Sequence, residues 1–137
     1  MFPGQGSQSV GMAKSLLTEF PSTRLIFEEA SESIHHDLVR LCSNDDQGLN
    51  LLETHNQQPA LLTMSCAIWS VLRSEVEISP KVFAGHSLGE YSALVASKHL
   101  NLSDAVKLVR ARGYAMQRAV PIGEGAMAAV LRFDEKE

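Results

Sequence analysis

The sequence has 137 residues and a net charge of −4, with 45% apolar and 20% charged side chains. This composition excludes an intrinsically disordered chain and is typical of one soluble globular domain. The acidic balance speaks against polyanionic partners, so we expect neither nucleic acid nor an anionic membrane to bind.

The N-terminal residues and the longest apolar segment indicate a cytoplasmic protein. Residues 1–4 lack the basic region and apolar stretch of a secretory signal. Residues 60–72 contain polar interruptions and fall short of the roughly 20 residues that span a bilayer. Cys42 and Cys66 have no partners at the spacing of a zinc site or a disulfide framework. We therefore expect no metal, no cofactor and two reduced cysteines, with Cys66 in the core.

The first half of the chain alternates turn residues with amphipathic segments. Residues 2–9 are rich in Gly, Pro, Ser and Gln, which indicates a loop. Residues 43–48 predict a second loop, and 49–52 a short helical turn. Pro59 suits the first turn of a helix. Apolar residues at helical spacing predict three helices, over residues 10–20, 25–34 and 59–72.

The second half adds short apolar runs that are typical of buried strands. Ser103 is a candidate N-cap, and Asp104 would then lie favourably in the first turn of its helix. The predicted elements are a strand over 81–84, a helix over 90–97, a helix from 103 to about 118 and a strand over 126–133. Helices that alternate with such strands favour an α/β fold with a mostly parallel sheet.

A serine lies between two glycines where the strand over 81–84 would meet the next helix. The segment from Gly85 to Gly89 matches the pattern G-x-S-x-G. Its glycines permit a sharp turn that would expose the Ser87 hydroxyl. The N–H of Leu88 could then face a developing oxyanion, a contribution of about 3 kcal/mol. A chance match in an ordinary turn is the alternative, and the flanking strand and helix favour a nucleophile.

The sequence offers Ser87 no evident general base. His86 is adjacent, but neighbouring side chains on a tight turn diverge, so we interpret it as structural. The other histidines lie in segments that look exposed and are interpreted as surface residues: His35, His36, His55 and His99. Because a serine hydroxyl needs a base within hydrogen-bond reach, the site is predicted to be incomplete.

Arg112 and Gln5 are the remaining candidates for a ligand site. Arg112 falls on the apolar stripe of the last predicted helix, and its guanidinium fork suits a carboxylate. Periodicity slightly favours the alternative, in which its stem packs on the core and its head reaches water or an internal acid. Arg110 falls beside Lys107 and Tyr114 and is predicted at the surface. Gln5 lies in a glycine-flanked loop, a simple turn by default, which lacks the lysine and Ser/Thr of a P-loop.

Five segments occur together in the order in which one enzyme family has them. They are FPGQGSQ at 2–8, QQPAL at 57–61, GHSLGEYSAL at 85–94, RG at 112–113 and GAMAA at 125–129. On these segments the chain resembles the malonyl-CoA:acyl carrier protein transacylases, acyltransferases of fatty-acid biosynthesis, from residue 2 to about residue 131.

The resemblance implies a ping-pong transfer of malonyl from coenzyme A to serine and then to the phosphopantetheine thiol of acyl carrier protein. Malonyl-CoA and acyl carrier protein are thus the implied partners. By position, Ser87 would be the nucleophile, and the backbone amides of Gln5 and Leu88 the oxyanion hole. Arg112 would bind the malonyl carboxylate, and Gln58 would support the site near Gln5. An acetyl group would leave the guanidinium unpaired, a loss of about 2–4 kcal/mol in a dry site.

The family pattern also implies parts that this sequence lacks. Family members continue through a ferredoxin-like subdomain and return to the core with the histidine base, and they have a strand ahead of FPGQG. The expected fold is therefore an incomplete, parallel-sheet, α/β-hydrolase-like acyltransferase core. We expect residues 1–125 to form this partial α/β core and 126–137 to start the truncated small subdomain.

Three functions follow from these expectations. The first is the malonyl transfer described above, with the isolated chain inactive because the histidine base is absent. The second is a serine esterase or hydrolase, which shares G-x-S-x-G but admits water to the acyl-enzyme. The third is a non-catalytic complementation fragment that associates through an exposed sheet edge.

Overall fold

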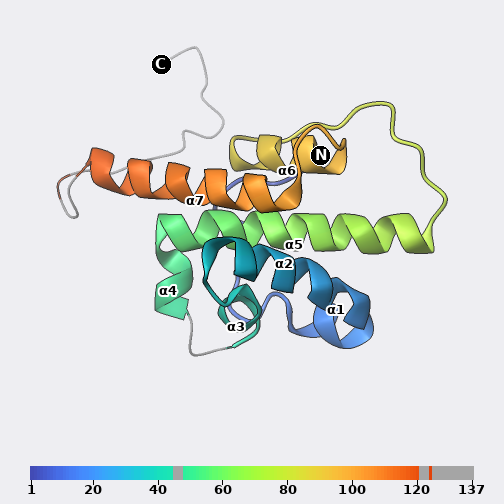
Figure 1. The fold of residues 1–137 in the computed structure, drawn as a ribbon, viewed down its shortest axis with the longest axis horizontal. Helices are drawn as coiled ribbons and strands as arrows, with labels where there is room; N and C mark the ends of the chain where they lie inside the picture. Colours follow the sequence, from blue (N-terminus) through green and yellow to red (C-terminus); the bar gives the residue numbers. More distant parts are fainter. Residues whose placement is uncertain (45–47, 121–123, 125–137) are drawn as a thin grey trace, which may run out of the picture.

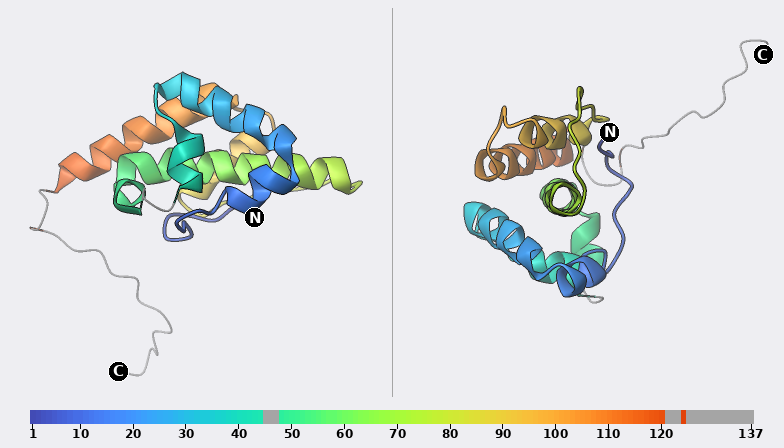
Figure 2. Two further views of the ribbon diagram at one scale, coloured as in Figure 1. Left: turned by 90° about the horizontal axis from the view of Figure 1, so that it is seen from below. Right: turned by 90° about the vertical axis from the view of Figure 1, so that its right-hand side faces the viewer.

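The computed structural model describes residues 1–44, 48–120 and 124. One long helix, α5 (Thr54–Glu75), runs through the middle of this part of the chain (Figure 1). The other helical segments are α1 (Lys14–Glu19), η1 (Pro21–Thr23), α2 (Arg24–Ile34), α3 (Leu38–Ser43), α4 (Gly48–Leu52), α6 (Leu88–Ala96) and α7 (Leu102–Ala119). Seen end-on, α5 lies between α6 and α7 on one side and the helices of the first third on the other (Figure 2). The central helix therefore contacts both layers and can position residues between them.

Apolar side chains from several helices form one core around α5. Its fully buried members include Phe27, Leu38, Leu41, Leu62, Leu88, Val106 and Val109. Full burial of such side chains stabilises the fold by roughly 1.5–3 kcal/mol each. The apolar periodicity that predicted helices over 25–34 and 103–118 is thus explained by α2 and α7. Among the described helices, none combines the length and the apolar run needed to cross a bilayer.

Both cysteines are buried in this core and neither forms a disulfide. Cys42 is fully inaccessible and Cys66 is 8% exposed, which confirms the prediction that Cys66 is a core residue. Burial raises the pKa of each thiol to about 12. Both side chains therefore behave as small apolar groups at neutral pH.

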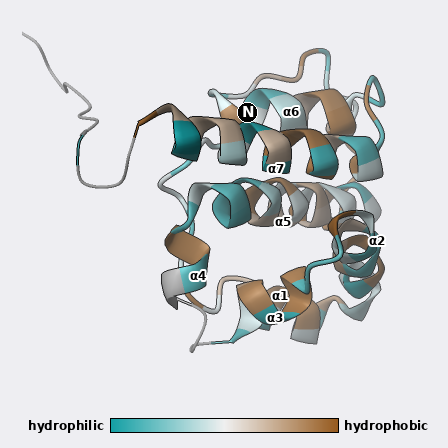
Figure 3. Ribbon diagram, turned by 60° about the vertical axis from the view of Figure 1, so that its left-hand side comes forward, coloured by the Kyte–Doolittle hydropathy of each residue, from teal (hydrophilic) through white to brown (hydrophobic). Residues whose placement is uncertain are grey.

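The start of α5 differs from its prediction. The helix begins at Thr54, and Pro59 lies in its interior rather than in its first turn. A proline there leaves the carbonyl of His55 without its usual helical donor. The first turns are nonetheless buried, although their side chains are hydrophilic, as the colour of α5 next to α4 shows (Figure 3). Packing of this polar turn against other elements outweighs the local preference for a helix start at proline.

The start of α7 also differs from its prediction, by a small shift. Asn101, not Ser103, is the N-cap, because its side chain accepts a hydrogen bond from the N–H of Asp104 at 2.8 Å. Asparagine and serine are similarly good caps, so the sequence alone did not separate them. Asp104 does lie in the first turn, as predicted.

The predicted strand over 81–84 is absent from the described structure. A single parallel bridge joins Phe2 to Gly85, and the N–H of Phe2 donates to the carbonyl of Ala84 at 2.8 Å. Val82 is 79% exposed, so this segment is not a buried strand here. A strand needs partners along its length, and residues 1–2 supply one bridge only. The α/β expectation is therefore not confirmed, and the predicted strand over 126–133 lies outside the described residues, as does the subdomain start at 126–137.

Candidate functional site

Ser87 occupies a strained turn immediately ahead of α6. Its φ of 53° and ψ of −103° fall in a region that residues with a side chain rarely adopt. Such a conformation costs of order 1–3 kcal/mol and persists where the surroundings enforce it. The side chain is exposed, so this turn presents the hydroxyl to solvent.

The two glycines of the motif permit this turn by removing side-chain volume. A Cβ added to Gly85 would lie 2.0 Å from the carbonyl of Gly89. A Cβ on Gly89 would lie 2.3 Å from the carbonyl oxygen of Phe2. The backbone of the turn is therefore folded against itself and against the N-terminal loop, and neither position accepts a larger residue without displacement.

The N-terminal loop, residues 2–8, lies against the serine turn. The N–H of His86 donates to the carbonyl of Phe2 at 3.2 Å, and a Cβ on buried Gly4 would lie 2.7 Å from His86 Nδ1. The Ser7 hydroxyl donates to the carbonyl of Gly4 at 3.0 Å. These contacts bring Gln5 to the same region as Ser87, although the two residues are far apart in sequence. His86 thus lies against Gly4 although it is exposed, and its structural role stays a prediction.

Arg112 reaches Ser87 directly. Its Nη2 donates to Ser87 Oγ at 3.0 Å, and its Nη1 donates to Gln58 Oε1 at 2.6 Å. The guanidinium carbon also lies 5.8 Å from the ring centroid of Tyr91, on α6. In the described part of the chain, no carboxylate pairs with this half-buried cation. The sequence alternative of an internal acid is therefore not realised there, and the positive charge stays available for an anion.

A glycine next to Arg112 sets this position. A Cβ on Gly113 would lie 2.5 Å from the Cα of His55 and 2.8 Å from the carbonyl oxygen of Thr54. The absence of that atom lets α7 cross closely over the first turn of α5. Arg112 thereby comes within hydrogen-bond distance of the fully buried Gln58.

Two consecutive glutamines on α5 serve two different parts of the site. Gln57 Oε1 accepts a hydrogen bond from Gln5 Nε2 at 2.6 Å, whereas Gln58 contacts Arg112 and donates from Nε2 to Met116 Sδ at 3.3 Å. Consecutive helical residues point about 100° apart, which separates their partners. The sequence placed Gln58 near Gln5, but Gln57 has that contact. Gln57 was missed, and its only signal was its place beside Gln58 in the QQPAL segment.

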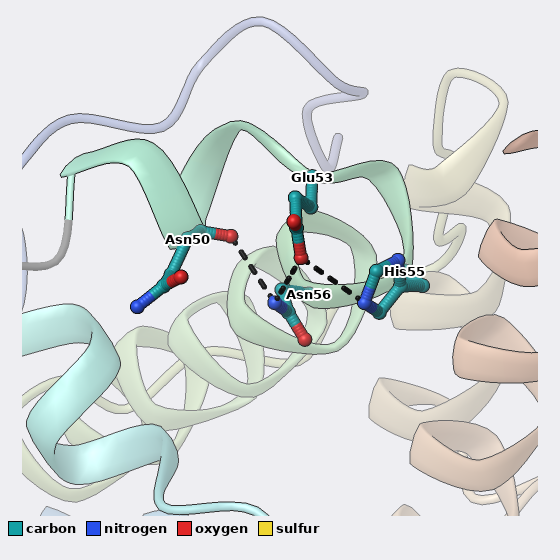
Figure 4. A network of polar contacts seen from close by, with 4 residues as sticks. All are labelled: Asn50, Glu53, His55 and Asn56. Atoms are coloured by element: carbon teal, nitrogen blue, oxygen red, sulfur yellow. Dashed lines mark hydrogen bonds and ion pairs between the residues drawn. The ribbon is translucent and has the colours of Figure 1, made fainter. Parts of the chain in front are cut away.

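A polar cluster fixes the start of α5 (Figure 4). Asn56 Nδ2 donates to the carbonyl of Asn50 at 3.2 Å and to Glu53 Oε2 at 3.1 Å. The same carboxylate oxygen lies 3.2 Å from His55 Nε2. Because Asn56 directly precedes the two glutamines, this cluster anchors the helix end that carries them.

None of the histidines in the described residues forms a hydrogen bond with Ser87. His35 and His99 are exposed, as expected. His36 and His55 are partly buried, so their interpretation as solvated surface residues is wrong. His55 stacks on Tyr114 of α7 with ring centroids 4.2 Å apart, a contact that local sequence could not reveal.

Arg110 is not the surface residue that periodicity predicted. It is partly buried, its Nη1 donates to the carbonyl of Ile34, and its guanidinium lies 5.8 Å from the ring centroid of Tyr114. The last carbonyls of a helix have no intrahelical donor, so α2 offers this acceptor where α7 packs against it. Nearby, burial lowers the pKa of His36 below its ordinary value, and the positive charge of Arg110 lowers it further.

The site thus combines an exposed hydroxyl with an adjacent cation, immediately ahead of the first turn of α6. Leu88 is the first residue of α6, where an N–H has no intrahelical acceptor and can donate to a ligand. In the residues that the structure describes, no three His, Cys, Asp or Glu side chains gather as a metal site would require. The chemistry that this arrangement supports is nucleophilic attack on a carbonyl whose substrate also carries an anionic group.

A family model and several named proteins match this chain. A model of the acyl transferase domain matches residues 1–137. The malonyl CoA-acyl carrier protein transacylase of Bacillus subtilis (strain 168) is 50% identical over 134 residues, which are 98% of this chain and 42% of that protein. The chain therefore spans less than half the length of this relative.

Solved structures of similar enzymes have the same fold over this region. The acyl-carrier-protein-S-malonyltransferase of Bartonella henselae is 43% identical with a TM-score of 0.87, covering 98% of this chain and 44% of that one. A malonyl-transacylase in complex with its type II polyketide synthase acyl carrier protein is 46% identical with a TM-score of 0.82, covering 88% and 38%. The described helices thus have the fold of the corresponding part of these structures.

Proposed function

The chain belongs to the acyl transferase domain family, and from this premise we propose that it contributes the nucleophile and the carboxylate receptor of a malonyl transferase. The acyl group would pass from coenzyme A to the phosphopantetheine thiol of an acyl carrier protein. The names of the similar bacterial enzymes support this choice of substrates. The main observation in support of the proposed function is that Arg112 contacts both Ser87 and Gln58.

The proposed reaction has two acyl transfers. Ser87 Oγ attacks the thioester carbonyl carbon of malonyl-CoA, the carbon–sulfur bond breaks, and coenzyme A leaves as its thiol with the proton taken from the serine. The carrier protein thiol then attacks the resulting ester, and the hydroxyl returns to Ser87. In each tetrahedral intermediate, the N–H groups of Gln5 and Leu88 would donate to the oxyanion.

The position of Arg112 suits a malonyl group because the two carbonyl carbons of malonyl are close together. Three bonds, about 4 Å, separate the serine oxygen from the free carboxylate carbon in a malonyl-serine ester. A guanidinium nitrogen 3.0 Å from Ser87 Oγ is within reach of that carboxylate. Gln58 occupies one N–H of the fork, so the group is oriented before substrate arrives. An acyl group without a second carboxylate would leave this cation unpaired.

A general base is still required for turnover. Because no described histidine forms a hydrogen bond with the Ser87 hydroxyl, we propose that the base belongs to the part of the relatives that this chain does not span. The 137 residues alone are then expected to acylate slowly. A chimera in which they replace the matching 134 residues of the Bacillus subtilis enzyme would restore the base.

The test uses the 137-residue chain and the chimera side by side. Each is incubated with malonyl-CoA, and the acyl adduct is located by intact mass and peptide mapping. We expect a malonyl ester on Ser87, rapid in the chimera, slow in the chain and absent after Ser87→Ala. Rapid turnover by the chain alone would refute its incompleteness. Release of free malonate faster than transfer to a pantetheine thiol would instead indicate the hydrolase.

A further inference from the structure

Gln57 is buried in the second turn of α5, yet it reaches the N-terminal loop. Its side chain is 7% exposed, and its Oε1 accepts from Gln5 Nε2 at 2.6 Å. This hydrogen bond joins two segments 52 residues apart in sequence. A buried amide oxygen that accepts so short a hydrogen bond is a specific link and not a surface contact.

The loop needs such a link at Gln5. Its neighbours are Gly4 and Gly6, and Gly6 has a φ of 99°, so the backbone here has unusual conformational freedom. The bridge at Phe2 fixes the loop before this point, and the Ser7 hydroxyl closes it on Gly4. The Ser7 contact fixes the carbonyl of the Gly4–Gln5 peptide, and the N–H of Gly6 donates to Gln8 Oε1 at 2.9 Å, but both hydrogen bonds lie within the loop. The hydrogen bond from the Gln5 side chain to Gln57 ties this part of the loop to α5.

We infer that Gln57 is a positioning residue that fixes the backbone N–H of Gln5 beside Ser87 by accepting a hydrogen bond from the Gln5 side chain. The inference rests on the proposed function, in which that N–H stabilises the oxyanion. Gln57 touches neither Ser87 nor Arg112 through any hydrogen bond in the described structure, so its effect passes through Gln5. Because Gln58 holds Arg112, the first turns of α5 support both the N-terminal loop at Gln5 and the guanidinium of Arg112.

Hydrogen exchange in the 137-residue chain tests the link without requiring catalysis. We expect Gln57→Met to raise amide exchange in the peptide covering residues 2–9 by about 3- to 10-fold, the range of one lost hydrogen bond. Gln58→Met is the matched control and should leave this peptide unchanged. Gln5→Met removes the donor from the less buried partner and should reproduce the effect even if Gln57→Met impairs folding. Unchanged exchange in Gln5→Met, or an equal rise in Gln58→Met, would overturn the inference.

Kinetics of the chimera test the consequence for acyl transfer. We expect Gln57→Met to lower kcat by about 10-fold with little change in KM, because a misplaced donor weakens transition-state binding. Gln5→Met should act equally, and the double variant should be no worse than either single one. Gln57→Glu, which keeps the accepting oxygen, should recover part of the loss.

The two kinds of failure are distinguishable. Additive effects of Gln5→Met and Gln57→Met on kcat would contradict the positioning role while malonyl transfer stands. An unsubstituted chimera that never acylates Ser87 would contradict the proposed function, whereas the exchange experiment would still decide whether Gln57 holds the loop.

Discussion

Two arginines lie two residues apart on α7, about 200° around the helix from each other, and they face different neighbours. Arg110 points to the layer of α2, where it donates to the carbonyl of Ile34 and lies near the ring of Tyr114. Arg112 points to the serine turn, where its partners are a hydroxyl and a buried amide. The first guanidinium holds two helices together, whereas the second is oriented by Gln58 and has no carboxylate partner among the described residues. The same type of side chain thus serves packing at Arg110 and, in the proposed function, substrate binding at Arg112.

Removal of the second arginine should have the largest effect on transfer. In the chimera, Arg112→Ala is expected to lower kcat/KM for malonyl-CoA by about 100-fold, since loss of a charge-assisted carboxylate contact costs roughly 2–4 kcal/mol. Steady-state transfer to a pantetheine thiol measures this. Arg110→Ala is the matched control. An equal loss of kcat/KM in both variants would show that the two arginines do not have different roles.

The close packing of α7 on α5 at Gly113, which places Arg112, should be the feature next most sensitive to substitution. Gly113→Ala puts a methyl group 2.5 Å from the Cα of His55, so α7 must move away from α5. We expect a loss of about 1–3 kcal/mol in the free energy of unfolding, as for other overpacked sites. Urea denaturation followed by circular dichroism gives this value, and an unchanged midpoint would show that the crossing tolerates a side chain.

Arg110 should matter for stability rather than chemistry. Arg110→Met keeps most of the apolar stem but removes the donor to Ile34, and we expect a loss of about 1 kcal/mol in the free energy of unfolding. Thermal and urea unfolding of the 137-residue chain would detect it. Acylation of Ser87 in the chimera should stay within twofold of the unsubstituted rate, because one lost α2 contact leaves Arg112 in place. A large loss of acylation would show that both arginines belong to the site.

A smaller, pH-dependent effect is expected beside Arg110. Burial and the charges of Arg110 and His55 lower the pKa of His36, while Asp37 and Glu53 oppose this. The unfolded chain therefore binds more protons than the folded one below the ordinary value of about 6.5. Stability from this group is complete above that pH and decreases as the pH falls toward the folded-state pKa. His36→Gln should flatten this part of a stability profile between pH 7 and pH 5, and an unchanged slope would contradict the assignment.

Local patterns in the sequence predicted several helices because those patterns depend on near neighbours. They did not predict α3, and they placed the start of the first helix at residue 10 rather than at Lys14. The amphipathic segments over 25–34 and 103–118 correspond to α2 and α7, and the serine motif does precede a helix. The resemblance to a known family, not periodicity, brought Ser87 and Arg112 together. Periodicity alone favoured a snorkelling Arg112 and a surface Arg110, because it does not reveal that α2 and α5 both pack against α7.

The remaining errors concern contacts between distant segments. A strand over 81–84 depends on partners along its length, and Phe2 alone supplies a bridge. Pro59 marked the helix start by local preference, whereas burial extends α5 back to Thr54. The link from Gln57 to Gln5 spans 52 residues and has no local signature beyond two adjacent glutamines. Such contacts follow from packing, which one sequence does not display.

The selectivity of Ser87 acylation tests the carboxylate receptor most directly. The rates of ester formation from malonyl-CoA and from acetyl-CoA would be measured by intact mass in the chimera and in its Arg112→Ala variant. We expect a strong preference for malonyl-CoA that falls by about 100-fold when the guanidinium is removed. A preference that is equal in both proteins would contradict the assignment of Arg112 as the group that binds the malonyl carboxylate.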